Sequence, residues 1–319
     1  MLLFVCGFPS GGTDLMKTVL NAHPDVAING ELPRLVELDR MGFGAATVFT
    51  DVAEIERFKA ALGRLDTWGN VENLGVDFRA LLAAEGPLPM VDALRRCFSS
   101  RDVCVWGSKT PQFTEQMPRL HRLFPQARFL VVLRDVRDVC LSWDRKWGKD
   151  MVLCAHKWAT RMAAGQRAAQ ALPPEAALAV RYEDLLDDPR SVCERICAFL
   201  DLPFAASMLE HHKHVGERID GKLNYGEAIR KDNRRKWVGR VPEPVLRRIE
   251  EIALPIMTQL GYTPDVATRH RPISARERLA GRTRDAVAAV LVGNRASQNN
   301  TLLERLRTVT RQVQRGLGA

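Results

Sequence analysis

A glycine-rich loop between a strand-like run and a helical pattern constrains the fold of this chain more than any other feature. The apolar run LLFVC at residues 2–6 precedes the loop GFPSGG, and apolar residues then recur at helical spacing from Leu15 to Leu20. A strand, loop and helix in this order direct backbone N–H groups and a helix N-terminus at one point, where an anion binds. The sequence therefore predicts a phosphate-binding loop at the start of an α/β fold.

Two side chains of the nucleotide triphosphatase loop are missing here. Gly7 and Gly12 have the spacing of the pattern G-x-x-x-x-G-K-[ST], but Thr13 and Asp14 stand where its lysine and hydroxyl residue belong. That lysine holds a γ-phosphate and that hydroxyl holds Mg²⁺. A donor whose transferred group carries less charge and needs no metal fits this loop better. Taken alone, the loop is also compatible with a tight glycine turn that binds nothing.

Three further strand-like runs follow, at residues 103–107, 128–133 and 177–182, with helical patterns between them at 111–124 and 151–171. Continuous apolar strands that alternate with helices indicate a parallel sheet covered on both faces. We predict an α/β fold: a P-loop-like parallel sheet flanked by helices, with a basic helical C-terminal extension. The corresponding domains are residues 1–265 and 266–319.

The insertion at about residues 50–100 carries no recognisable chemistry. Helical patterns cover residues 51–65 and 87–98, and a looser segment at 67–75 lies between them. A lid or an acceptor-binding element is the hypothesis for this insertion.

Composition narrows the class of protein. With 319 residues, of which 46% are hydrophobic, the chain can bury one large core. No apolar run reaches the roughly 20 residues of a membrane span, and no signal-peptide n-region precedes the first strand. We therefore expect a soluble, cytoplasmic protein. The seven cysteines are scattered through core-like segments, which predicts buried thiols rather than disulfides or a zinc site.

The net charge of +9 is concentrated at the C-terminus. Residues 266–319 contain 11 arginines and three acidic residues, a net charge of +8. Apolar residues recur there at helical spacing, for example at Leu279, Val290, Leu306 and Val313. A basic amphipathic helix packs on its own protein, on a second copy in a homodimer, or on an anionic membrane surface. No nucleic acid is expected, because no aromatic residue lies between the arginines.

Charged or polar residues follow the predicted strands at the edge where ligands of parallel sheets bind. Lys109 follows the second run, Arg134 follows the third, and Tyr182 ends the fourth. Taken together with the glycine loop, they predict an anion site built for more than one phosphate.

These motifs stand in a familiar order: the glycine loop, KTP at 109–111, RDVRD at 134–138 with Ser142, RYEDLLDDP at 181–189, and RKWVGRVP at 235–242. Across residues 2–265 the chain resembles the sulfotransferases that use 3'-phosphoadenosine 5'-phosphosulfate (PAPS), and within them the tyrosylprotein-sulfotransferase-like branch. The resemblance implies transfer of a sulfuryl group to a hydroxyl or amine without a metal, with adenosine 3',5'-bisphosphate (PAP) as the product.

The resemblance also implies where the donor binds. The 5'-phosphosulfate of PAPS would lie on the loop residues Ser10, Gly11, Gly12, Thr13 and Asp14. Arg134 and Ser142 match the pair that holds the 3'-phosphate. Tyr182 matches a tyrosine near the adenine, and Lys236 matches a late basic residue that closes over the donor.

Two residues are implied to be catalytic. Lys109 matches the lysine that stabilises charge on the leaving oxygen, and Glu31 matches the general base that deprotonates the acceptor. Each has a simpler alternative: a solvated lysine, and an acid in the first turn of a helix that Glu31 is expected to open. His23, which precedes a proline, is interpreted as structural.

Departures from the family pattern leave the acceptor open. The loop usually reads P-R-S-G-T-T, so Ser10 removes an arginine and Asp14 introduces a carboxylate. Pro33 stands where the family has an arginine. A small molecule, a sugar, a lipid or a peptide therefore remains a candidate acceptor. A non-catalytic nucleotide-binding scaffold is the main alternative function, and a P-loop kinase is the other.

Overall fold

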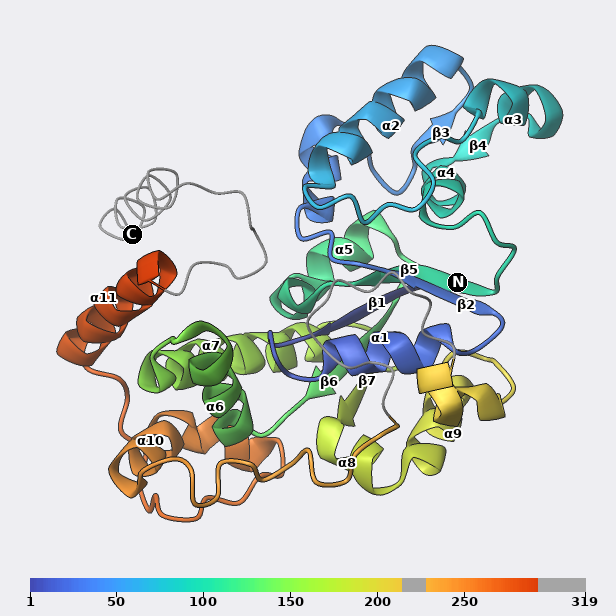
Figure 1. The fold of residues 1–319 in the computed structure, drawn as a ribbon. Helices are drawn as coiled ribbons and strands as arrows, with labels where there is room; N and C mark the ends of the chain where they lie inside the picture. The colour runs from blue at the N-terminus through green and yellow to red at the C-terminus, as the bar shows by residue number, and fades with distance from the viewer. Residues whose placement is uncertain (214–227, 292–319) are drawn as a thin grey trace. The chain divides into compact units, whose positions relative to one another are not determined.

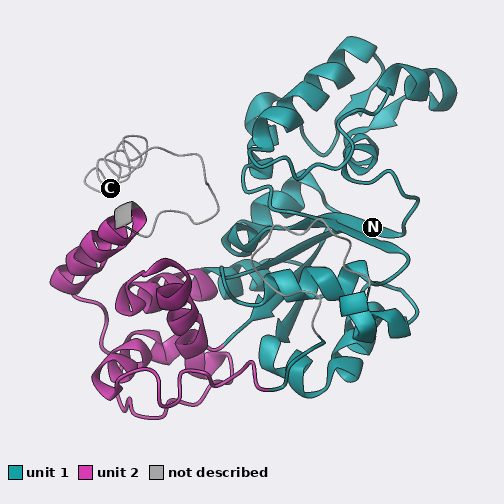
Figure 2. Ribbon diagram, in the orientation of Figure 1, with its two compact units in different colours: residues 1–134, 164–231 teal, residues 135–163, 232–319 magenta. Residues whose placement is uncertain are grey.

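The computed structural model describes residues 1–213 and 228–291 (Figure 1). They belong to two compact units, which are described separately: unit 1 comprises residues 1–134 and 164–231, and unit 2 comprises residues 135–163 and 232–319 (Figure 2). Within the described ranges, none of the helices combines the length and the apolar character that a membrane span requires.

A five-stranded parallel sheet in the order β2-β5-β1-β6-β7 forms the core of unit 1. Its strands are β1 (Leu2–Gly7), β2 (Val26–Asn29), β5 (Val105–Lys109), β6 (Arg128–Leu133) and β7 (Ala177–Arg181). The predicted α/β class is confirmed, as are the four strands at the predicted places. β5 begins two residues later than expected, so that Lys109 is its last residue. The sequence analysis missed β2, whose four residues are too few for a periodic signal.

Helices cover both faces of this sheet. They are α1 (Thr13–Asn21), α5 (Met117–Leu123), α8 (Tyr182–Asp187), α9 (Pro189–Phe199) and the 3-10 helices η2 (Pro111–Glu115), η3 (Pro174–Ala176) and η4 (Ala206–Lys213). Leu3 and Val5 of β1 belong to one buried cluster with residues of α1, α8 and α9. The ring of Phe4 lies 5.2 Å from that of Phe113 in η2, between centroids. Since side chains alternate along a strand, β1 joins both cores.

The insertion is a small helical layer of unit 1 (Figure 1). It follows η1 (Leu35–Met41) and contains β3 (Val48–Phe49), α2 (Val52–Leu65), α3 (Phe78–Glu85), β4 (Leu88–Pro89) and α4 (Met90–Phe98). Asp51 caps α2, since its carboxylate accepts the N–H of Ala53 at 2.8 Å. The helix predicted at 51–65 is confirmed. The helix predicted at 87–98 begins later, at Met90, because residues 88–89 pair with β3 instead.

The cysteines occupy the core, as predicted, with one exception. All seven are free thiols; six are buried, and Cys104 is exposed. Burial raises the pKa of Cys6 to about 12, although a hydrogen bond with Thr114 acts in the opposite direction.

Unit 2 contains α6 (Val136–Trp147), α7 (Met151–Gln170), α10 (Glu243–Gln259) and α11 (Ala275–Leu291). The last residues of α7, from 164 onward, belong to unit 1. Ser274 and Glu277 form a capping box at the start of α11, and the carboxylate of Glu277 also accepts two bonds from Arg248 of α10. Residues on both sides of 265 are thus packed in one unit. The boundary at 265 stays a prediction, and residues 292–319 of the basic tail, with its apolar Leu306 and Val313, lie outside the described residues.

A buried ion network fixes the segment that follows β6. Arg137 makes a forked contact with the carboxylate of Asp135 and donates to Glu250 of α10 at 2.8 Å. Glu250, whose exposed fraction is 0%, also accepts the backbone N–H groups of residues 265–267. Burial alone raises the pKa of Glu250, but these N–H donors and Arg137 outweigh it, so that the pKa lies below its ordinary value of 4.5. The network ties α6, α10 and the following loop together.

We expect Glu250→Gln to lower the free energy of unfolding by about 3 kcal/mol at neutral pH, because it leaves Arg137 without one of its two buried partners. A folded pKa below 4.5 means that the stabilisation is present above pH 4.5 and is lost as the pH falls through the folded pKa. Urea unfolding at neutral and acid pH measures both effects. The control is Glu243→Gln on the same helix, an exposed i,i+4 pair with Arg247 that should cost under about 0.5 kcal/mol. An equal loss at every pH would contradict the assignment.

Candidate active site

The glycine loop between β1 and α1 is shaped by its own backbone. Gly11 donates its N–H to the carbonyl oxygen of Phe8 at 2.8 Å, and Ser10 and Gly12 hold positive φ angles of 64° and 91°. α1 has no side-chain cap at its N-terminus, so the N–H groups of its first turn lack an acceptor within the helix. The loop therefore offers the anion cradle that was predicted. The N–H of Gly11, however, is used within the turn.

Ser10 carries a hydroxyl that the turn does not use. Its Oγ atom is buried and has no hydrogen-bond partner among the described residues. Buried hydroxyls without a partner are rare in folded proteins, and a bound ligand or water commonly satisfies them. Thr13, the first residue of α1, is 2% exposed and lies directly after the loop.

Tyr182 and Arg134 pack against the same loop. A Cβ atom added to Gly12 would lie 2.2 Å from Cδ2 of Tyr182, so the loop approaches the tyrosine as closely as only glycine permits. The guanidinium carbon of Arg134 lies 4.4 Å from the centre of that ring, and Nη1 donates to the carbonyl oxygen of Ser10 at 3.0 Å. The predicted donor residues that follow β1, β6 and β7 thus meet in one place.

Lys109, at the end of β5, is the most buried charge of the site, with 5% of its surface exposed. Its Nζ atom lies 2.6 Å from Oδ1 of Asp14 and 2.7 Å from Oε1 of Glu31. Burial by itself lowers the pKa of Lys109, but the two carboxylates outweigh it, so that its pKa is raised. Lys109 is therefore a charged ammonium that two carboxylates hold in place, and it is not a solvated lysine.

Glu31 reaches Lys109 from the end of a strand. It lies two residues after β2, in an irregular segment before η1, so the expectation that it opens a helix is wrong. β2 pairs with β5, and Asn29 lies opposite Ser108, so parallel pairing brings Glu31 close to Lys109. The simpler interpretation of Glu31 as a first-turn helix acid no longer applies.

Asp14, a predicted donor-site residue, has a partner that the sequence analysis did not identify. It lies in the first turn of α1, where the helix dipole favours a carboxylate, and its side chain meets Lys109 rather than solvent alone. Two carboxylates thus flank one ammonium. The signal was visible as an acid in place of a hydroxyl, but nothing local in the sequence identified its partner.

Ser142 and Lys236 belong to unit 2, and their meeting with Arg134 stays a prediction. Ser142 is half-buried within α6. Trp237, next to Lys236, donates its backbone N–H to Asp138 at 3.2 Å, and its ring lies 4.2 Å from the guanidinium carbon of Arg137. Within unit 2, residues 135–138 and the RKW segment are therefore neighbours, and the ring of Trp237 packs on Arg137.

His23 is structural, as predicted. The ring is 1% exposed; its Nε2 atom lies 3.0 Å from the carbonyl oxygen of Pro203, and its Nδ1 atom accepts the N–H of Asp25. Both ring nitrogens are thus used in holding the backbone. Elsewhere in residues 1–213 and 228–291, no three His, Cys, Asp or Glu side chains are grouped as metal ligands.

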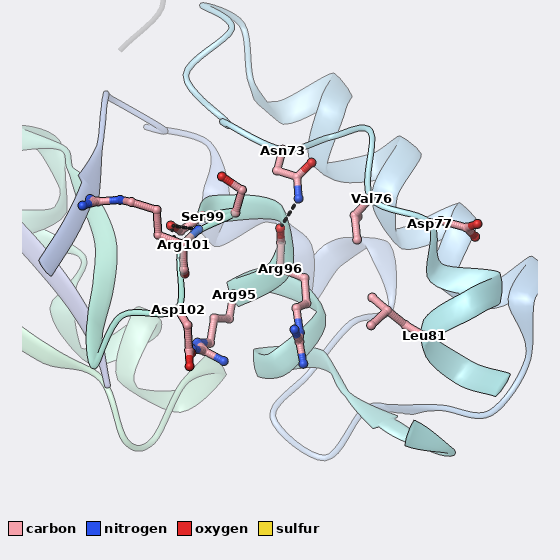
Figure 3. A pocket seen from close by; sticks show the side chains of 10 residues that line it. Asn73, Val76, Asp77, Leu81, Arg95, Arg96, Ser99, Arg101 and Asp102 are labelled. Carbon is pink, nitrogen blue, oxygen red and sulfur yellow. Dashed lines mark hydrogen bonds and ion pairs between the residues drawn. The ribbon is translucent and has the colours of Figure 1, made fainter. Parts of the chain in front are cut away.

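A hollow of unit 1 lies away from these residues. It has a volume of about 680 Å³ and is formed by the insertion, with Asn73, Asp77, Arg95 and Arg96 on its wall (Figure 3). Arg95 pairs with Asp102, and Arg96 pairs with Glu85 at 2.8 Å. None of the residues around Lys109 lines this hollow.

Comparisons with known proteins agree with this geometry. A family model described as the sulfotransferase family matches residues 3–206. Over 282 residues the chain is 27% identical to protein-tyrosine sulfotransferase 1 of Danio rerio, which covers 82% of this chain and 72% of the relative. It is 25% identical over 279 residues to protein-tyrosine sulfotransferase A of Caenorhabditis elegans, and this match covers 82% of this chain and 67% of the relative.

A solved structure has the same fold. The sulfotransferase domain from the olefin synthase of Synechococcus PCC 7002 matches with a TM-score of 0.56 and 21% sequence identity, over 82% of this chain and 94% of that domain. At this identity the match concerns the fold alone.

Gly12→Ala should destabilise the protein by about 3 kcal/mol or more, because it adds a steric clash with Tyr182 to the strain of a left-handed backbone. Gly42→Ala is the matched control, since Gly42 has a φ of 86° and nothing within 4 Å of the added carbon. The control should lose only about 1–2 kcal/mol. Chemical unfolding measures both. Adding Tyr182→Ala to Gly12→Ala should cost less than the two single losses summed; strict additivity would refute the contact.

Proposed function

The chain belongs to the sulfotransferase family, and we propose that it transfers the sulfuryl group of PAPS to a hydroxyl or amine of an acceptor, with Glu31 as the general base. The contact that supports this most strongly is the one between Lys109 Nζ and Glu31 Oε1, 2.7 Å long, at the carboxyl edge of the sheet. Lys109 is buried, whereas the carboxylate of Glu31 is partly exposed and can reach an acceptor. A surface ion pair with a structural role does not need a buried ammonium, so this arrangement favours a role in acid–base chemistry.

Each residue has one task in the reaction. Glu31 takes the proton of the acceptor while the acceptor oxygen or nitrogen forms its bond to sulfur. The bond between sulfur and the bridging oxygen breaks, and negative charge grows on that oxygen. Lys109 stabilises this charge electrostatically. PAP then leaves as the second product.

The donor site follows from the same edge of the sheet. The loop N–H groups and the free hydroxyl of Ser10 suit the 5'-phosphosulfate, since both donate hydrogen bonds to an anion. Arg134 offers a forked donor for the 3'-phosphate, to which Ser142 of α6 adds a hydroxyl. Tyr182 supplies an aromatic surface near the adenine, and Lys236 closes over the donor.

Asp14 gives this site a feature of its own. In the free protein its carboxylate shares the ammonium of Lys109 with Glu31. The anionic donor competes for that ammonium and is repelled by Asp14. Asp14 therefore weakens donor binding while it keeps Lys109 charged and oriented.

The proposals for the acceptor, the cellular location and the partners rest on less specific observations than those for the active site. The relatives are named for protein tyrosine as acceptor, and peptide, sugar, lipid and small-molecule acceptors are all proposed for testing. The cytoplasmic location stays part of the proposal. α11 exposes Leu279 at 65% and Val287 at 49%, with arginines between them, which supports a homodimer contact or an anionic membrane surface as its partner.

Removing either catalytic group should abolish most of the turnover. With radiolabelled PAPS, EDTA and a panel of a tyrosine peptide, a serine peptide, a hexose and an amino alcohol, we expect kcat to fall about 10²–10³-fold for Lys109→Ala. For Glu31→Gln the loss should be about 10²–10⁴-fold. Lys59→Ala, which removes a half-buried lysine of α2, is the matched control and should keep kcat. Wild-type turnover that survives both active-site changes would refute the mechanism.

Donor binding should respond in opposite directions to two substitutions. In calorimetric titration with PAP in EDTA, Arg134→Ala should weaken binding about 100-fold, because it removes a charge-assisted forked contact. Asp14→Thr should strengthen binding about tenfold, because it removes a like charge. Binding by the wild type without transfer to any acceptor would favour the scaffold alternative. Equal affinities for all three proteins would overturn the donor site.

A further inference from the structure

The segment of the insertion from Asp66 to Val71 lies against the proposed base. Asp66 is 9% exposed, and its two carboxylate oxygens accept the N–H groups of Asn70 and Val71 at 2.8 and 2.7 Å. This pair of bonds closes the segment into a fixed turn at the end of α2. We refer to residues 66–71 as the Asp66 turn.

The Asp66 turn holds the backbone of Glu31. Asn70 Nδ2 donates to the carbonyl oxygen of Glu31 at 3.0 Å. Gly30 makes room for this contact, because a Cβ atom at residue 30 would lie 1.9 Å from Oδ1 of Asn70. The approach of Asn70 to this point therefore depends on the missing side chain of Gly30.

The other side of the same peptide group is also held. Leu32 N–H, which shares one peptide plane with the Glu31 carbonyl, donates to Oγ1 of Thr110 at 2.9 Å. Thr110 is fully buried and directly follows Lys109 in the chain. One peptide group is thus gripped by two side chains: Asn70 from the insertion and Thr110 from the end of the lysine strand.

We propose that Asn70 and Thr110 are positioning residues for Glu31, and that the insertion contributes to catalysis through the Asp66 turn. This inference rests on the proposed function of Glu31. Glu31 lies in an irregular segment that no strand ladder holds, so its backbone depends on these side-chain contacts. Because this peptide group is held, the Cα atom of Glu31 is held as well, and the side chain can place its carboxylate beside Lys109. The rate of proton removal from an acceptor is sensitive to displacements of about 1 Å.

A matched control lies in the same loop. Asn73 Nδ2 donates to the carbonyl oxygen of Arg96, a bond drawn as a dashed line in Figure 3. This bond is of the same kind as that of Asn70, and both are 3.0 Å long. Asn73→Ala and Asn70→Ala therefore remove equivalent hydrogen bonds. Only Asn70→Ala releases the backbone of Glu31.

The experiment compares kcat, PAP affinity and thermal stability for Asn70→Ala, Asn73→Ala and Thr110→Val, with the panel acceptor that wild type uses fastest. We expect kcat to fall about 10- to 100-fold for Asn70→Ala and Thr110→Val. PAP affinity should stay unchanged, and Tm should shift about equally for the two asparagine variants. Full kcat in Asn70→Ala, or an equal loss of kcat in Asn73→Ala, would overturn the proposal.

Gly30→Ala provides a test of the contact itself. The added methyl group should displace Asn70 and lower kcat as much as Asn70→Ala does. The double variant Gly30→Ala/Asn70→Ala should be no worse than either single variant, because the clash and the bond involve the same side chain. Additive losses would show that Gly30 acts by another route, and would overturn the contact.

Failure of the proposed function gives a different result. If wild type transfers no sulfuryl group to any acceptor, the enzymatic role of Glu31 is lost, but the two-sided grip remains measurable by hydrogen exchange. Exchange at Leu32 N–H should then be faster in Asn70→Ala than in wild type or Asn73→Ala, because release of the carbonyl loosens the shared peptide group. Equal exchange in the three proteins would overturn the positioning role as well.

Discussion

A buried ammonium with two carboxylate partners is the interaction on which the site depends. Removing Lys109 from water costs several kcal/mol unless paired charges and hydrogen bonds compensate. Its partners come from two other elements: Asp14 from α1, and Glu31 from the segment after β2. The sheet register that places Val5 opposite Lys109 keeps the lysine beside the glycine loop. Strand order, loop and helix must therefore all form before the charge is compensated.

The glycine loop imposes a second constraint through close packing. Gly12 lies so near Tyr182 that a methyl group would not fit. The guanidinium of Arg134 packs on the same ring and donates a hydrogen bond to the carbonyl oxygen of Ser10 in the loop. A rigid cradle of this kind orders N–H donors before an anion arrives, which lowers the entropic cost of binding. Asp14 opposes that gain with its charge. In the proposed donor site, affinity is accordingly expected to reflect a balance between a preformed cradle and a nearby carboxylate.

In unit 2, a charged segment at the start of α6 is buried and held by ion pairs. The segment DVRD at residues 135–138 carries one arginine and two aspartates, and burying these charges requires partners on other elements. Glu250 supplies one partner to Arg137 and also holds the backbone of residues 265–267. Trp237 covers the guanidinium of Arg137. The motif that carries Ser142 is thereby anchored to α10 and to the segment that carries Lys236.

The sequence by itself determined the parts of this protein that local patterns encode. Apolar runs located β1, β6 and β7, and the glycines located the turn between β1 and α1. Lys109 and Arg134 were identified because parallel strands end at one edge. Periodicity missed the short strand β2, and with it the reason that Glu31 lies at a strand end.

Only the tertiary structure decided which side chains meet. The pairing of Asp14 with Lys109 joins residues 95 positions apart, and the bond from Asn70 to Glu31 joins an insertion of unassigned role to the proposed base. Neither contact leaves a periodic or compositional trace, because each depends on the register of strands and the closure of a turn far away in the chain. Spacing along the sequence specifies elements, whereas distances between charges are set only when those elements pack.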